Sequence, residues 1–192
     1  LIGEQYHWQT YTNYTQGRAK MRLERIAHAA WAEGIKATVY NCPEIRTNSS
    51  DIFAGVELPL ILLLKALKKE NGGEWAEAQW HACRDLLTDD HSVEAVLQKV
   101  SDFHESAVMQ GFRDFAAWPM PNSLALADLM IPMSNAIVKM HKDRNALITD
   151  LLSRLVIEAS GPLIFLDSSD PAGPVLWLNH DIIARQLNRL HA

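Results

Sequence analysis

Histidine and acidic side chains are the residues in this sequence that could bind a metal ion or transfer protons, since the 192 residues include 8 His and 23 Asp or Glu. A metal site on a helix needs two ligands three or four positions apart on one face. His81 and Asp85 have this spacing, but no third ligand accompanies them. Such pairs on amphipathic helices are usually surface pairs, so we predict no metal ion and no other cofactor. The same interpretation applies to two further clusters, Asp102, His104 and Glu105, and Asp89, Asp90 and His91.

Motifs for nucleophilic or nucleotide chemistry are missing from the sequence, which has no GxSxG, GxGxxG or Walker-type loop. Cys83 lies among alanine, tryptophan and leucine, which indicates a small buried apolar residue. Cys42 is too distant in sequence for a CxxC zinc site, and a disulfide between the two cysteines stays open. We therefore predict that the chain is not an enzyme. The alternative is a helical metal-dependent hydrolase, whose residues would be His81, Asp85, His104 and Glu105.

Basic residues are concentrated in the first 50 residues, which hold six Lys or Arg against four Glu in a chain of net charge −5. Three of these arginines recur at positions i, i+4 and i+7, so one helix face would carry all three. Guanidinium groups pair well with carboxylates, whereas the acidic chain argues against nucleic acid. A solvated helix face and a DNA-binding accessory protein remain alternatives. The residues that we predict to bind acidic segments of a substrate or partner are Arg46, Arg18, Lys20, Arg22 and Arg25.

Apolar residues recur at helical spacing through most of the chain, with glycine or proline between the segments. Residues 35–50 break this period and are predicted to form a loop. Ser123 starts a helix that Pro132 breaks or kinks, and Ser134 starts the next helix, which ends at Gly161-Pro162. The helices predicted before residue 119 extend over 18–33, 59–70 and 74–87, and a fourth runs from a cap at Asp90 or Ser92 to near Trp118.

The last 30 residues have a different pattern. Two short apolar runs, 163–167 and 175–178, flank a turn rich in Pro, Gly and Asp, which predicts a β-hairpin. A terminal helix follows. The predicted fold is mainly α, an irregular multi-helix bundle with one small β-hairpin near the C-terminus, in a single domain over 1–192. Residues 1–50 form a basic membrane-proximal segment, residues 51–160 form the helical core, and residues 161–192 form the hairpin and the terminal helix.

Several short motifs follow one another along nearly the whole chain. They begin with Glu4-Gln5-Tyr6-His7-Trp8, Ile45-Arg46 with Phe53-Ala54-Gly55, and Leu58-Pro59 with Lys65-Ala66-Leu67. The later ones are Asn71-Gly72-Gly73 with residues 76–86, His141 with Leu151-Leu152, and Phe165-Leu166 with Asp170 and Leu176-Trp177. In type and order they resemble the motifs of the DotM/IcmP family, which includes the TrbA-type proteins of conjugative plasmids.

This resemblance implies the cytoplasmic domain of a membrane-anchored protein in a type IV secretion or conjugation system. Such a domain is a non-enzymatic adaptor that recruits substrate or partner proteins with acidic segments to the coupling ATPase, without direct contact to nucleic acid. The anchor would lie upstream of Leu1, at the cytoplasmic face of the bacterial inner membrane. The fragment itself is expected to be soluble, because its longest uncharged apolar run, 58–64, is far shorter than the ~20 residues of a membrane helix.

Overall fold

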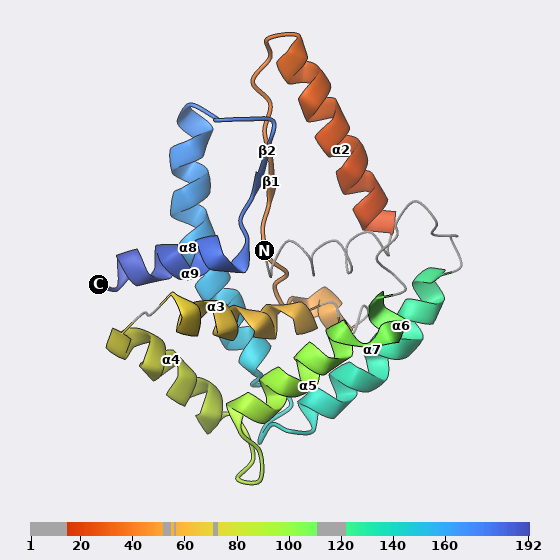
Figure 1. The fold of residues 1–192 in the computed structure, drawn as a ribbon, viewed down its shortest axis with the longest axis vertical. Coiled ribbons are helices and arrows are strands. Elements are labelled where there is room, and N and C mark those ends of the chain that lie inside the picture. The colour runs from red at the N-terminus through yellow and green to blue at the C-terminus, as the bar shows by residue number, and fades with distance from the viewer. Residues whose placement is uncertain (1–14, 52–54, 56, 71–72, 111–121) are drawn as a thin grey trace.

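The computed structural model describes residues 15–51, 55, 57–70, 73–110 and 122–192 (Figure 1). The helices are α2 (Thr15–Ala32), α3 (Leu63–Lys69), α4 (Gly73–Asp85), α5 (Val93–Glu105), α6 (Ala107–Gln110), α7 (Asn122–Val138), α8 (Ile148–Ser169) and α9 (His180–Leu190). Two 3-10 turns, η1 (Asn48–Asp51) and η2 (Leu58–Leu62), and two strands, β1 (Val39–Asn41) and β2 (Val175–Trp177), complete the described elements. The predicted class, mainly α with a small β element, is confirmed.

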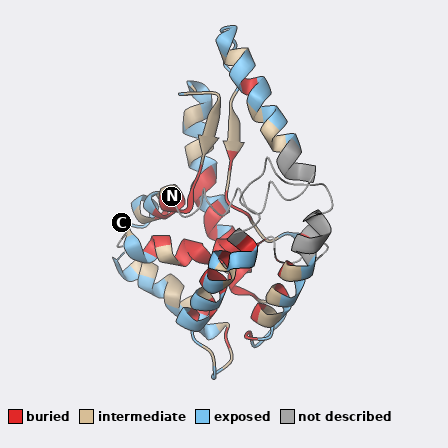
Figure 2. Ribbon diagram, turned by 45° about the vertical axis from the view of Figure 1, so that its right-hand side comes forward, coloured by how far each residue is buried: buried red, intermediate tan, exposed pale blue. Residues whose placement is uncertain are grey.

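The core is built around the run of η2 and the first turn of α3. Its leucines and isoleucine have no polar face, so all sides of the run must be covered by other elements. Residues 58–64 are buried, and Figure 2 shows the buried residues gathered where this run meets its neighbours. α5 and α8 pack against η2, and α9 packs against both α3 and α8. In contrast, α2 extends away from the core with mostly exposed residues (Figure 2).

The two strands form a parallel pair and not the predicted hairpin. β1 pairs with β2 in the register Val39↔Val175, Tyr40↔Leu176 and Asn41↔Trp177. The apolar run 163–167, which we predicted to be the partner strand of β2, lies inside α8. This prediction is wrong because tertiary contacts hold the run in helical form: Leu163 and Ile164 pack against the core, and the Tyr40 hydroxyl donates to Asp167 Oδ2 at 2.9 Å.

Pro132 and Pro162 were both predicted to interrupt or end a helix, but each lies inside a continuous helix. α7 continues through Pro132 to Val138, and α8 continues through Pro162 to Ser169. A proline inside a helix costs about 3 kcal/mol, and the burial of Met130 and Ile137 on either side of Pro132 offsets that cost. Ser134 accordingly lies within α7 and not at a helix start.

The long helix predicted to begin at Asp90 or Ser92 and to end near Trp118 is divided at Ser106. Ser92 caps α5, since its Oγ accepts the backbone N–H of Ala95 at 3.1 Å. At the other end Ser106 adopts an extended conformation, donates its hydroxyl to the Phe103 carbonyl at 2.7 Å and accepts the N–H of Met109 at 3.3 Å. The serine therefore ends one helix and starts α6. The predicted stop near Trp118 lies outside the described residues.

A loop over 139–147 separates α7 from α8, and hydrogen bonds of the His141 ring connect this loop to both helices. The ring Nδ1 lies 2.8 Å from the carbonyl oxygen of Ile137, while Nε2 lies 3.1 Å from the backbone nitrogen of Ile148. The N–H of Ile148 must donate to Nε2, so Nδ1 carries the ring proton and donates to Ile137. The neutral imidazole is thus part of the cap of α8. Burial lowers the pKa of His141, against the opposing effects of the Ile137 bond and the Asp150 charge.

Acidification should therefore weaken the fold through His141. Since its pKa is lowered in the folded protein, the unfolded chain binds more protons once the pH falls below about 6.5. Stability should then fall with pH down to the folded-state pKa, by up to about 1.4 kcal/mol per pH unit. Urea unfolding between about pH 7.5 and about pH 5 measures this slope. His141→Gln keeps a donor and an acceptor without titrating, so it should show a shallower slope; an unchanged slope would contradict the assignment.

The backbone of Gly55 lies close to Met130 of α7. Its φ is +94°, a conformation that side chains rarely adopt. A Cβ atom placed on Gly55 would lie 2.7 Å from Met130 Cβ and 2.9 Å from the Met130 carbonyl oxygen. Glycine is therefore required here for both its backbone conformation and its lack of a side chain.

Candidate functional site

A group of polar side chains lies at the end of β1. Asn41 and Glu44 are buried at 1% and 3% exposure, and Cys42 between them is half-buried. α2 contributes two residues one helical turn apart, Lys20 and Glu24, which share one face. Asn41 Nδ2 donates a 2.6 Å hydrogen bond to Glu24 Oε1. These five residues are called the polar cluster.

Burial shifts the pKa of two members of the polar cluster, Lys20 and Cys42. It lowers the pKa of Lys20, and the charges of Glu44, Cys42 and Glu24 oppose this shift. Burial raises the pKa of Cys42, against the opposing effects of Lys20 and a hydrogen bond with Ser160. Burial thus disfavours the charged form of both groups, the ammonium of Lys20 and the thiolate of Cys42. Cys42 and Cys83 are both free thiols, and burial raises the pKa of Cys83 to about 12.

A second polar contact joins the segment after β1 to the start of α8. Arg46 Nη1 lies 2.8 Å from Asp150 Oδ1, and the backbone N–H of Arg46 donates to Ser153 Oγ at 2.7 Å. The other oxygen, Asp150 Oδ2, accepts the backbone N–H of Leu147 at 2.8 Å. One carboxylate therefore holds the guanidinium group and caps the helix.

Glu57 is a buried carboxyl group near this contact. It is 5% exposed, and burial raises its pKa, opposed by backbone hydrogen bonds, the charge of Arg46 and the Ser134 hydroxyl. Ser134 Oγ lies 3.5 Å from Glu57 Oε1. The sequence analysis did not identify Glu57, because a single glutamate before an apolar run gives no signal of burial.

The predicted acid-binding residues are placed in two different environments. Lys20 belongs to the polar cluster and Arg46 is paired with Asp150, so both face inward. Arg22 and Arg25 lie exposed on α2. The backbone of Arg18 is helical, and its side chain lies outside the described residues. Binding of acidic segments by these residues stays a prediction, which the positions of Arg22 and Arg25 fit best.

The residues required by the hydrolase alternative do not meet. His104 on α5 is fully buried, its Nδ1 lies 2.8 Å from the Val100 carbonyl oxygen, and burial lowers its pKa. Its neighbour Glu105 is exposed, and His81 and Asp85 are exposed on α4. Within the described ranges, no group of three or more histidine, cysteine or acidic residues could hold a metal ion.

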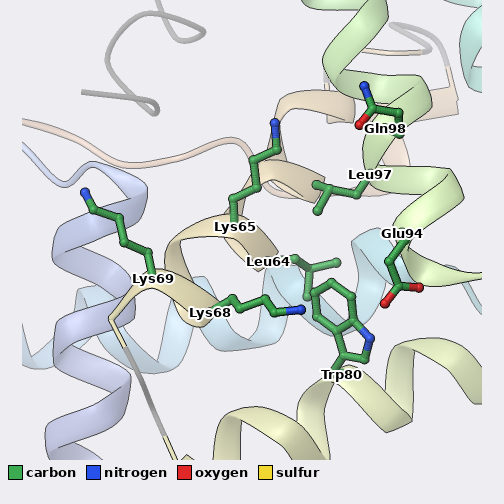
Figure 3. Close-up of a pocket in the computed structure, with 8 residues that line it drawn as sticks. All are labelled: Leu64, Lys65, Lys68, Lys69, Trp80, Glu94, Leu97 and Gln98. Carbon is green, nitrogen blue, oxygen red and sulfur yellow. The ribbon is translucent and has the colours of Figure 1, made fainter.

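A cavity of about 360 Å³ lies between α3, α4 and α5 (Figure 3). We call it the lysine pocket, after the three lysines that α3 contributes. The spacing of these lysines, at i, i+3 and i+4, places them on one helix face, and this was the sequence signal that could have indicated the pocket. Its lining residues are Leu64, Lys65, Lys68, Lys69, Trp80, Glu94, Leu97 and Gln98.

Comparison with known proteins identifies the class. Residues 1–187 match the family described as enoyl-acyl carrier protein reductase FabMG. The chain therefore belongs to the FabMG family of enoyl-acyl carrier protein reductases. No curated protein matches the chain.

Two solved structures of FabMG are similar to this chain. The apo structure of FabMG, a novel type of enoyl-acyl carrier protein reductase, is 69% identical with a TM-score of 0.87, over 94% of this chain and 41% of that one. The NADH-bound structure of FabMG is 63% identical with a TM-score of 0.76, over 94% of this chain and 44% of that one. The chain thus spans less than half the length of these relatives.

The family match corrects several predictions. The resemblance to DotM/IcmP and TrbA-type proteins is wrong, as are the adaptor function, the coupling ATPase as a partner and the prediction that the chain is not an enzyme. The metal-dependent hydrolase and the DNA-binding accessory protein do not match either. The motifs indicated the wrong family because they are short and common in helical proteins. Leu-Pro at a helix start and Leu-Leu in a helix core reflect helix packing, which unrelated helical proteins share.

The predicted location at the inner-membrane face has no support from the comparisons. None of the helices among the described residues is long and apolar enough to cross a membrane.

Proposed function

We propose that the protein containing this chain is an enoyl-acyl carrier protein reductase, which reduces the carbon–carbon double bond of an enoyl group carried on an acyl carrier protein. The observation that carries the proposal is the family match over residues 1–187. The 69% identity to FabMG over 94% of the chain supports it. The NADH-bound FabMG structure suggests NADH as the reductant.

Among the described residues, the turn from β2 to α9 joins a strand to a helix N-terminus, as the turn of a dinucleotide site does. Dinucleotide sites place the pyrophosphate on a glycine-rich turn at a helix N-terminus. Here the turn is Leu178-Asn179, without glycine, and Asp181 in the first turn of α9 is 4% exposed. A buried carboxyl group would repel a phosphate. This turn therefore does not fit the cofactor.

The exposed arginines of α2 are the residues of this chain that we propose to contact the protein substrate. Arg22 and Arg25 lie one turn apart and exposed, so a carrier protein that presents carboxylates could pair with both. Exposed pairs each contribute only about 0–1 kcal/mol. Their combined effect should therefore appear in KM and weaken with salt.

The test is NADH oxidation by the full-length protein with an enoyl-acyl carrier protein. We expect turnover that depends on the enoyl group, and none with the same carrier bearing a saturated acyl group. Absence of turnover with the enoyl substrate would overturn the proposed reaction.

Charge reversal tests the carrier contact separately. Arg22→Glu with Arg25→Glu should raise KM about tenfold at low salt, with kcat unchanged. The matched control is Lys139→Glu with Arg144→Glu, which also reverses two exposed charges and should leave KM unchanged. Equal KM values for the two double variants would remove α2 from the contact without affecting the reductase assignment.

A further inference from the structure

The lysine pocket combines an apolar centre with ammonium groups at both ends. Figure 3 shows Leu64 and Leu97 in the middle, Lys65 and Gln98 at one end, and Lys68, Trp80 and Glu94 at the other. Leu64 is almost fully buried, at 1% exposure. The cavity volume of about 360 Å³ lies at the lower end of the range for small-molecule sites.

One ammonium group is held in place by a buried partner. Lys65 Nζ donates to Ser101 Oγ at 2.6 Å, and Ser101 is 2% exposed. An ammonium group carries three donors, of which Ser101 accepts one. Because the side chain is already ordered, an anion that binds Lys65 loses less conformational entropy than it would with a mobile lysine.

The second ammonium group lies on an aromatic surface. Lys68 Nζ lies 4.8 Å from the centroid of the Trp80 ring, a cation–π distance. Glu94 is the acid in the first turn of α5, where the helix dipole favours it. Lys69 points away from the other two lysines in Figure 3 and lies 3.9 Å from Asp181. Two lysines and one glutamate therefore lie at the edges of the apolar centre.

We propose that the lysine pocket binds an alkyl chain that ends in an anionic group. The alkyl chain packs on Leu64, Leu97 and the Trp80 ring, and the anionic group pairs with Lys65 or Lys68. A carboxylate and a phosphate share this chemistry. This inference is independent of the proposed reductase activity, since it depends only on the geometry of α3, α4 and α5.

Calorimetric titration of the full-length protein with octanoate, octyl phosphate, octanol and inorganic phosphate tests the pocket. We expect octanoate or octyl phosphate to bind about tenfold more tightly than octanol, which lacks the charge, and than inorganic phosphate, which lacks the chain. The tighter of the two charged ligands identifies the anionic group. Octanol binding as tightly as both charged ligands would overturn the proposal.

Variants assign the binding to this pocket and not to another acyl site of the full-length protein. Lys65→Gln with Lys68→Gln should remove one equivalent of the charged ligand or weaken it about tenfold. The control is Lys36→Gln. Lys36 is an exposed lysine between α2 and β1 that pairs with Asp170, and the variant protein should bind the ligands as the wild type does. Identical titrations for the double variant and wild type would show that the lysines bind no such ligand.

Discussion

Gly55→Ala is expected to lower the free energy of unfolding by about 2–5 kcal/mol. Part of this loss comes from the positive φ of +94°, which an L-residue adopts at a cost of about 1–2 kcal/mol. The rest comes from the contacts of the new Cβ with Met130, at 2.7 Å and 2.9 Å. One of the two opposing atoms is a backbone oxygen, so α7 itself would have to move. Urea unfolding followed by circular dichroism measures the loss.

Gly34→Ala separates the two causes. Gly34 also has a positive φ, +83°, but nothing lies within 4 Å of a Cβ placed there. The variant should therefore lose only the conformational part, about 1–2 kcal/mol. Equal losses at Gly34 and Gly55 would show that the approach to Met130 does not constrain the fold.

Asp150→Ala is expected to destabilise the protein by about 2–4 kcal/mol. The change removes the cap on the Leu147 N–H, which lies 2.8 Å from the carboxylate, and the partner of Arg46 at 2.8 Å. The side chain of Arg46 is 21% exposed, so its charge would lose this partner in a half-buried setting. The 34% exposure of Asp150 keeps the loss below that of a fully buried pair.

Asp150→Asn distinguishes the cap from the charge. An amide oxygen can still accept the Leu147 N–H, whereas it cannot neutralise Arg46. We expect a loss of about half that of the alanine variant. Asp128→Ala, at an exposed position of α7, is the control and should change stability by less than about 0.5 kcal/mol. A loss at Asp128 as large as at Asp150 would contradict the assignment.

The helical class could be predicted from periodicity because most of the helices carry a clear apolar face. The pairing of the strands could not, because three-residue strands such as 39–41 have no period and their partner is distant in sequence. Leu163 and Ile164 have the types expected in a strand. Their helical form depends on the core and on the bond from Tyr40 to Asp167, which no local pattern reveals.

The candidate site was only partly predictable for a related reason. Lys20 and Arg46 were identified by charge, but their burial depends on the segment after β1 meeting α2 and α8. The lysine pocket needs three helices to form, so the types of Trp80 and Leu97 alone do not indicate that they line it. The family itself was identified by similarity over nearly the whole chain, since no local motif in the sequence indicates it.

The parallel strand pair has a consequence for synthesis on the ribosome. The Thr38 hydroxyl donates to the Gly173 carbonyl oxygen, 135 positions further along the chain. At typical translation rates β1 emerges on the order of ten seconds before β2 exists. During that interval its backbone groups are open to strands of other nascent chains, and pairing with them would compete with the native contact. Slower elongation between the two strands should therefore increase aggregation of the newly made protein.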